Sequence, residues 1–304
     1  MSEESAAVTT RRIVISGEQI VRWAVRVLWA ALPFTAGPSL ADALDGASRP
    51  VQLVASLGLW VGWAAGVAAS AVALPVALTA LRVLAPAALA AVAAAAAGEG
   101  DGAPLAVGWT AVTAGWIFSP TFGALCVNGP AYPDERRFLL RAPAPLVFGP
   151  LVLAWALTVA GVASGPLLLA ARQWVPGAVL TAAGPPLAWL LVRGVHDLSR
   201  RWIVFVPAGV VLHDPLTLVD PVLVQRRTIA AVGPALVGTA AIDLTQRSPG
   251  LALEIALKEP LDLTLVRPGR RLGDSVSARA VLVTPTRPGA VLDEARRRRL
   301  PTGT

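Results

Sequence analysis

Residues that could carry catalysis are few and scattered in this chain. His196 and His213 are the only histidines, and Tyr132 is the only tyrosine. Lys258 is the only lysine and is followed by glutamate, so the Gly-Lys-Ser/Thr of a phosphate-binding loop is absent. Neither a HExxH zinc motif nor a Gly-x-Ser-x-Gly nucleophile elbow occurs. We therefore expect no enzymatic activity, no catalytic residues, no bound cofactor and no metal site.

Two further groups are of chemically reactive types, but their sequence context predicts structural roles. Cys126 is the only cysteine, which excludes a disulfide framework and the usual cysteine-rich zinc site. It ends an apolar run, so we expect a buried thiol. His196 and Asp197 form an acid–base pair without a nucleophile, which favours the end of a helix at a membrane interface.

The arginine clusters are the features best suited to binding, and their chemistry is anion recognition. Residues 199–304 hold 14 arginines and Lys258 against nine acidic residues, a net charge of +6, whereas residues 1–198 have a net charge of +1. Each arginine near an anionic leaflet contributes about 1 kcal/mol within a Debye length of about 8 Å. The alternative for the last four arginines is a solvated helix end that complements the helix dipole. Predicted lipid contacts are Arg226, Arg227, Arg270, Arg271, Arg296, Arg297, Arg298 and Arg299.

The elements that must position these residues lie mostly in a membrane. Hydrophobic residues make up 55% of the 304 residues and charged residues 15%, whereas a soluble domain carries about 25% charged residues. A membrane-spanning helix needs about 20 apolar residues. We predict a cytosolic tail at 1–18 and a transmembrane domain at 19–193 with six spans, at about 19–42, 51–73, 83–98, 104–127, 145–170 and 174–193. Arg82 and Arg172 would lie in turns between spans.

The first of these spans has an alternative reading, because its charged-then-apolar order also fits a cleaved signal peptide. Arginines concentrate in alternate loops, and this asymmetry predicts cytoplasmic N- and C-termini. The strong preference for arginine over lysine suggests a bacterium with a GC-rich genome, and hence a multi-pass protein of the bacterial cell membrane.

Small residues recur every four positions along the second span and predict a close helix–helix contact. This face consists of Gly58, Gly62, Gly66 and Ser70. It would serve packing within the bundle or, alternatively, a homodimer. Helix breakers at Ser119–Pro120 and at 184–186 would kink packed helices or, alternatively, build a transporter site from broken helices.

From Trp202 onward, short β-rich runs separated by turn residues predict a small, mostly β cytosolic domain at 199–300, with a tail at 301–304. The opening hairpin comprises 201–206 and 209–211, and a basic third strand follows at 224–229. A turn is expected at Glu259–Pro260 and a helix over 288–300. This order resembles the bacterial pleckstrin-homology-like (PH-like) domains, which are often fused to membrane spans. The resemblance implies a barrel closed by a C-terminal helix, and a binding or scaffolding role without catalytic residues. The alternative is a generic β-sandwich or α+β domain.

The leading hypothesis is therefore a non-enzymatic membrane protein. An α-helical integral membrane bundle would hold a basic β domain against the anionic inner leaflet, as a scaffold or interaction module. A protein partner or a second copy of the chain would complete the assembly, and no nucleic acid is expected as a partner. The alternative is a small transporter or permease component that uses the Pro/Gly-kinked helices.

Overall fold

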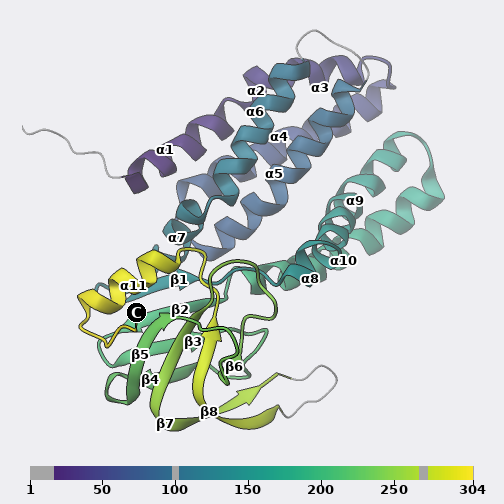
Figure 1. Ribbon diagram of the computed structural model, residues 1–304. Coiled ribbons are helices and arrows are strands. Elements are labelled where there is room, and N and C mark those ends of the chain that lie inside the picture. The colour runs from purple at the N-terminus through teal and green to yellow at the C-terminus, as the bar shows by residue number, and fades with distance from the viewer. Residues whose placement is uncertain (1–16, 98–102, 267–272, 304) are drawn as a thin grey trace, which may run out of the picture.

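The computed structural model describes residues 17–97, 103–266 and 273–303, which form a helical bundle followed by a β-rich domain (Figure 1). The predicted tail at 1–18 therefore lies almost wholly outside the described residues. The helices before the β-rich domain are α1 (Gly17–Ala30), α2 (Leu32–Thr35), α3 (Gly37–Leu44), α4 (Arg49–Ala71), α5 (Pro75–Ala96), α6 (Ala103–Phe118), α7 (Pro120–Asn128), α8 (Ala144–Val147), α9 (Pro150–Ala170) and α10 (Trp174–Leu198).

Within the described residues, four helical segments are long and apolar enough to cross a membrane: α4, α5, α8 together with α9, and α10. The pair α6 and α7 passes the same test together and is bent by 51°, so it makes a fifth span if it is counted as one. The structure thus supports an apolar helical part with four or five candidate spans. The predicted first span at 19–42 is not among them.

Prolines explain why that first segment is divided. Pro33 and Pro38 each stand in the first turn of a new short helix, α2 and α3, where a proline is tolerated because the amide it lacks would be unpaired there. The segment from Gly17 to Leu44 is therefore three short helices in sequence rather than one continuous helix.

Arg82 was expected in a turn, and that expectation is wrong. The turn lies at 72–74, and α5 begins at Pro75, so Arg82 is inside the helix. The third predicted span accordingly begins at Pro75, eight residues earlier than expected. Pro75 favours the start of a helix, and the charge of Arg82 does not interrupt that helix. Arg172 does lie in the turn between α9 and α10, with a left-handed φ of 61°.

Helix α10 is longer than expected, because it continues to Leu198 rather than ending near 193. Pro185 and Pro186 lie inside it, and the helix is continuous through them. Gly184 faces Gly161 of α9 so closely that a Cβ on Gly184 would overlap that carbonyl. The small residues here bring the two backbones together, which is the role expected of them in helix pairs.

The β-rich domain has two four-stranded sheets, in the orders β1-β2-β3-β4 and β5-β7-β8-β6, and a C-terminal helix. In the described residues these sheets are separate, so the expected closed barrel is not observed. The elements are β1 (Arg136–Leu139), β2 (Trp202–Val206), β3 (Gly209–His213), β4 (Val222–Gln225), the 3₁₀ helix η1 (Arg226–Thr228), β5 (Ile229–Pro234), β6 (Ile242–Asp243), β7 (Leu253–Leu265), β8 (Asp274–Val283) and α11 (Pro288–Arg297).

The second sheet and the C-terminus differ from expectation in detail. Glu259–Pro260 is not a turn, because β7 continues through it and pairs with β8 on both sides of a bulge between Ala256 and Leu261. Residues 301–303 are not a free tail either. The amide of Val232 donates to the carbonyl of Pro301 (2.8 Å), and the amide of Gly303 donates to the carbonyl of Val232 (3.1 Å).

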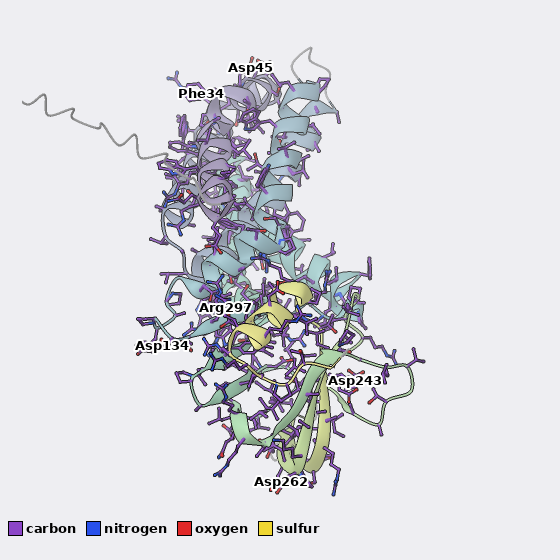
Figure 2. All side chains as sticks on the ribbon, turned by 60° about the vertical axis from the view of Figure 1, so that its left-hand side comes forward. Phe34, Asp45, Asp134, Asp243, Asp262 and Arg297 are labelled. Carbon is purple, nitrogen blue, oxygen red and sulfur yellow. The ribbon has the colours of Figure 1, made fainter. Side chains whose placement is uncertain are left out.

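The β-rich domain lies at one end of the helical bundle (Figure 1). Figure 2 places Phe34 and Asp45 at the end of the bundle far from Asp243 and Asp262 of the domain. At the near end, Arg136 forms an ion pair of 3.4 Å with Glu18 of α1. The segment α1–α3 therefore starts beside the domain and leads to the far end of the bundle.

Candidate functional site

Strand β1 joins the two parts of the molecule. It lies in the chain between α7 and α8, yet it pairs antiparallel with β2, which follows α10. Arg136 is opposite Phe205, and Leu139 is opposite Trp202. This segment lies between the predicted spans at 104–127 and 145–170, so the predicted domain at 199–300 lacked one of its strands. The segment 133–141 belongs to the same body as the C-terminal domain.

The side chains of this segment divide between two cores. Phe138 and Leu140 are buried in the β-domain core, next to residues such as Ile203 and Leu212. Leu139, between them, is 2% exposed and belongs to the bundle core with Leu81 and others. Successive residues of a strand point to opposite faces, so one short strand seals the domain on one face and the bundle on the other.

A buried ion pair fixes the chain where it leaves the bundle. Arg201 and Asp214 have side chains 1% and 3% exposed. Two hydrogen bonds join them, Nε to Oδ1 at 2.8 Å and Nη2 to Oδ2 at 2.7 Å. The remaining guanidinium nitrogen, Nη1, donates to the carbonyl of Arg141 at 2.7 Å. Arg201, at the start of the predicted opening hairpin, thus ties the segment after β1 to β2 and β3.

The four arginines at 296–299, at the end of α11, differ in their partners. Arg296 pairs with Asp293 at 3.0 Å, and Glu294 pairs with both Arg297 and Arg298. Arg298 also donates to the carbonyl of Asp134 at 2.8 Å, which docks the helix beside the segment that leads to β1. Three of the four predicted lipid contacts in this run are therefore already occupied by protein partners.

The fourth arginine of the run behaves differently. Arg299 has a φ of 55°, a left-handed conformation that glycine usually takes just after a helix. A side chain in this region costs about 1 kcal/mol. The amide of Leu300 donates back to the carbonyl of Ala295 at 2.9 Å, which completes the helix end and leaves Leu300 buried.

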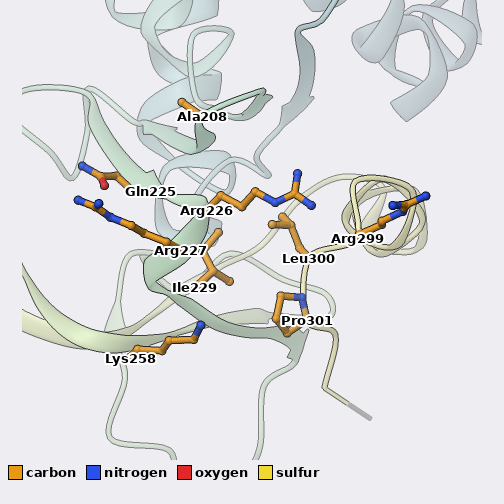
Figure 3. Close-up of a pocket in the computed structure, with 9 residues that line it drawn as sticks. All are labelled: Ala208, Gln225, Arg226, Arg227, Ile229, Lys258, Arg299, Leu300 and Pro301. Atoms are coloured by element: carbon orange, nitrogen blue, oxygen red, sulfur yellow. The ribbon is translucent and has the colours of Figure 1, made fainter.

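Arg299 lines a groove with three other cations, which we call the basic groove. Its volume is about 580 Å³. In Figure 3, the guanidinium of Arg226 reaches towards Leu300 and the end of α11, whereas Arg227 points the opposite way and Lys258 lies below. The lining residues are Ala208, Gln225, Arg226, Arg227, Ile229, Lys258, Arg299, Leu300 and Pro301.

The predicted lipid contacts are thus only partly brought together. Arg226, Arg227 and Arg299 share the basic groove, and Arg270 and Arg271 lie outside the described residues. Sequence reasoning missed Lys258 as a binding residue, although it had noted that Lys258 is the only lysine. The expected turn at 259–260 concealed its position, because β7 runs through that point and carries Lys258 to the groove.

The predicted glycine face is used at one end. A Cβ on Gly66 would overlap the indole of Trp29, which packs directly on it, and Ser70 is 6% exposed. A Cβ on Gly62 would only touch Leu84 at 4.0 Å, and Gly58 has no neighbour within 4 Å. Half of the face therefore packs α4 against α1 within the bundle, and the half around Gly58 is uncovered in this structure.

His196 takes part in a polar contact between helices. Its Nδ1 lies 2.8 Å from Oγ1 of Thr79, which is also 3.2 Å from Oγ of Ser199. Thr79 and Ser199 are 2% and 1% exposed, so neither hydroxyl is open to a substrate. The contact joins α5 to the end of α10.

No protein-family model, no curated protein and no solved structure matches this chain. Its function is therefore inferred from the residues and contacts described above.

Proposed function

We propose that this chain is a non-enzymatic integral membrane protein whose helical bundle holds a basic β domain at the inner surface of the cell membrane. The domain would act there as a scaffold or interaction module. Strand β1 is the observation that carries the proposal. A domain that only followed the last span would be tethered by one connection, whereas this domain receives a strand from between α7 and α8 and a second entry after α10.

Three contacts support a fixed rather than a tethered domain. Leu139 packs in the bundle core, Arg201 binds the carbonyl of Arg141, and Arg298 binds the carbonyl of Asp134. Held in this way, the positive charge of residues 199–304 stays near the headgroups, where electrostatic attraction to anionic lipids acts over about 8 Å. The two sheets and C-terminal helix support the PH-like resemblance as a proposal about the fold.

We also propose six crossings, with α1–α3 as the first, because this segment leads from the domain end of the bundle to its far end. Asp45 and Asp134 would then lie on opposite sides of the membrane. We expect a membrane-impermeant maleimide to label Asp45→Cys in intact bacterial cells. Asp134→Cys should react only after the cells are permeabilised, and both side chains are exposed. The native Cys126 is 1% exposed and should not react with the maleimide. Labelling of Asp134→Cys in intact cells would refute an inner-surface domain.

A second function, that of a small transporter, is favoured by one specific arrangement. The α6–α7 pair is bent by 51°, and Gly123 of α7 leaves room for Arg82, whose Nη2 lies 3.3 Å from where a Cβ on Gly123 would be. Nε of Arg82 is buried without a hydrogen-bond partner among the described residues. An arginine beside a broken helix can bind an anionic solute. Solute flux into proteoliposomes that Arg82→Gln abolishes would favour this function over the scaffold.

A further inference from the structure

Three separate parts of the chain meet at the basic groove. Arg226 and Arg227 come from η1, between β4 and β5, and Lys258 comes from the middle of β7. Arg299 follows α11 in the left-handed conformation described above. These segments are distant in sequence, so the concentration of positive charge is a product of the fold rather than of one basic run.

The four cations have no carboxylate partner within the described parts of the chain. The described residues show no ion pair and no hydrogen bond from the side chains of Arg226, Arg227, Lys258 or Arg299, and none of the lining residues is acidic. The neighbouring Arg296, Arg297 and Arg298 are all paired with carboxylates. Like charges gathered without counterions raise the local potential and attract an anion, and guanidinium groups match the geometry of phosphate oxygens.

The floor of the groove adds a second requirement for its ligand. Ile229 is fully buried and Leu300 is 6% exposed, and Pro301 lies beside them. The volume of about 580 Å³ is within the usual range for small-molecule sites and exceeds what one phosphate fills. A single carboxylate would leave most of the four charges unbalanced, whereas a phosphomonoester or diphosphate offers several charged oxygens.

We propose that the basic groove is a binding site for a ligand that carries a phosphomonoester or diphosphate group. The proposal rests on the proposed function, since it names what the held domain would bind. The phosphate could belong to a lipid headgroup or to a free phosphorylated compound, and both present the same chemistry to the groove.

The test uses the full chain in nanodiscs. Inorganic pyrophosphate is titrated by calorimetry into protein held in phosphatidylcholine alone, and then into protein held in phosphatidylcholine mixed with phosphatidic acid, whose headgroup is a phosphomonoester. We expect saturable one-to-one binding in the first disc. If phosphatidic acid weakens that binding, a lipid headgroup competes for the groove. If the affinity is unchanged, the natural ligand is a free phosphorylated compound.

Matched variants separate a discrete site from general positive charge. Arg226→Gln with Lys258→Gln removes two charges from the groove, and Arg296→Gln with Arg297→Gln removes two charges outside it. We expect the first pair to weaken binding at least tenfold and the second to change it less than twofold. Arg227→Gln with Arg299→Gln is a second groove pair, for the case in which the first disturbs the fold.

Two results would overturn the proposal. One is the absence of saturable pyrophosphate binding by the folded wild-type protein in phosphatidylcholine discs. The other is an equal loss of pyrophosphate affinity in the groove variants and in the control variants. The cysteine labelling described above keeps this failure distinct from failure of the proposed function. If Asp134→Cys is protected in intact cells but pyrophosphate does not bind, the phosphate site in the basic groove is rejected and the proposed function still stands.

Discussion

Replacing Asp214 by asparagine is expected to lower the free energy of unfolding of the β domain by about 3–5 kcal/mol. The substitution leaves the guanidinium of Arg201 positively charged and 1% exposed, without the carboxylate that receives two of its hydrogen bonds. An uncompensated charge in such a site carries a large desolvation penalty, because water cannot reach it. Asparagine has nearly the same shape as aspartate, so the effect reports charge rather than lost volume.

Hydrogen exchange measured by mass spectrometry on the detergent-solubilised protein provides the readout. Peptides covering β2 and β3 should exchange about a hundredfold to a few thousandfold faster, since each 1.4 kcal/mol corresponds to a factor of ten. Arg296→Gln breaks a pair whose side chains are 61% and 72% exposed, and it should cost less than about 1 kcal/mol.

A double variant tests whether the unpaired buried charge of Arg201 causes the loss of stability. Arg201→Met with Asp214→Leu replaces the ion pair by apolar side chains, and the carbonyl of Arg141 keeps its hydrogen bond of 2.9 Å from Ser248. This variant should be more stable than Asp214→Asn alone, because no buried charge remains. Equal exchange in Asp214→Asn and wild type would show that Arg201 does not need its partner.

The second large effect is expected from Gly66→Leu, which should lower the Tm of the solubilised protein by about 5–10 °C. The indole of Trp29 fills the space that any Cβ at this position needs. Separating α1 from α4 would also break two reciprocal hydrogen bonds, from Nε1 of Trp29 to the carbonyl of Trp63 (2.9 Å) and from Nε1 of Trp63 to the carbonyl of Trp29 (3.2 Å).

Gly58 supplies the matched control on the same helix. It has no neighbour within 4 Å, so Gly58→Leu should leave the melting temperature of the monomer within about 2 °C of wild type. A loss of stability at Gly58 that matches the loss at Gly66 would mean that the whole face is covered, as in the homodimer alternative. An unchanged Tm for Gly66→Leu would contradict the observed packing of Trp29.

Composition and charge predicted an apolar helical part followed by a β-rich domain, because long uncharged runs give way to short β-rich runs with many charged residues after about residue 199. The hairpin of β2 and β3 was also predictable, since both strands and the turn at 207–208 are adjacent in sequence. The start of a helix was less predictable where a charged residue suggested a turn and a nearby proline favoured an earlier helix start. Arg82 lies inside α5 because Pro75 begins the helix.

The site was harder to predict because its parts are joined only by long-range pairing. The four residues of β1 have no polar–apolar alternation, since Phe138 and Leu139 are both buried, each in a different core. Nothing in the local sequence of Arg201 distinguishes a buried partner of Asp214 from an interfacial arginine. Arg226 and Arg227 could be named as anion-binding residues from the sequence, but only the fold shows that they line one groove with Lys258.

We infer that β1, which lies in the chain between α7 and α8, completes the β domain. Residues 199–304 expressed alone lack Phe138 and Leu140 of the domain core and the carbonyl of Arg141 that binds Arg201. Leu140 donates to the carbonyl of Arg201 at 2.8 Å, so the ends of 133–142 and 199–304 meet, and a short glycine linker can replace residues 143–198.

Comparing these two soluble chains tests the claim most directly. We predict that the linked chain unfolds cooperatively on heating and gives a dispersed amide NMR spectrum. Residues 199–304 alone should unfold without a cooperative transition or aggregate. A cooperative transition and an equally dispersed spectrum for residues 199–304 alone would show that the domain does not need β1, and would contradict the claim.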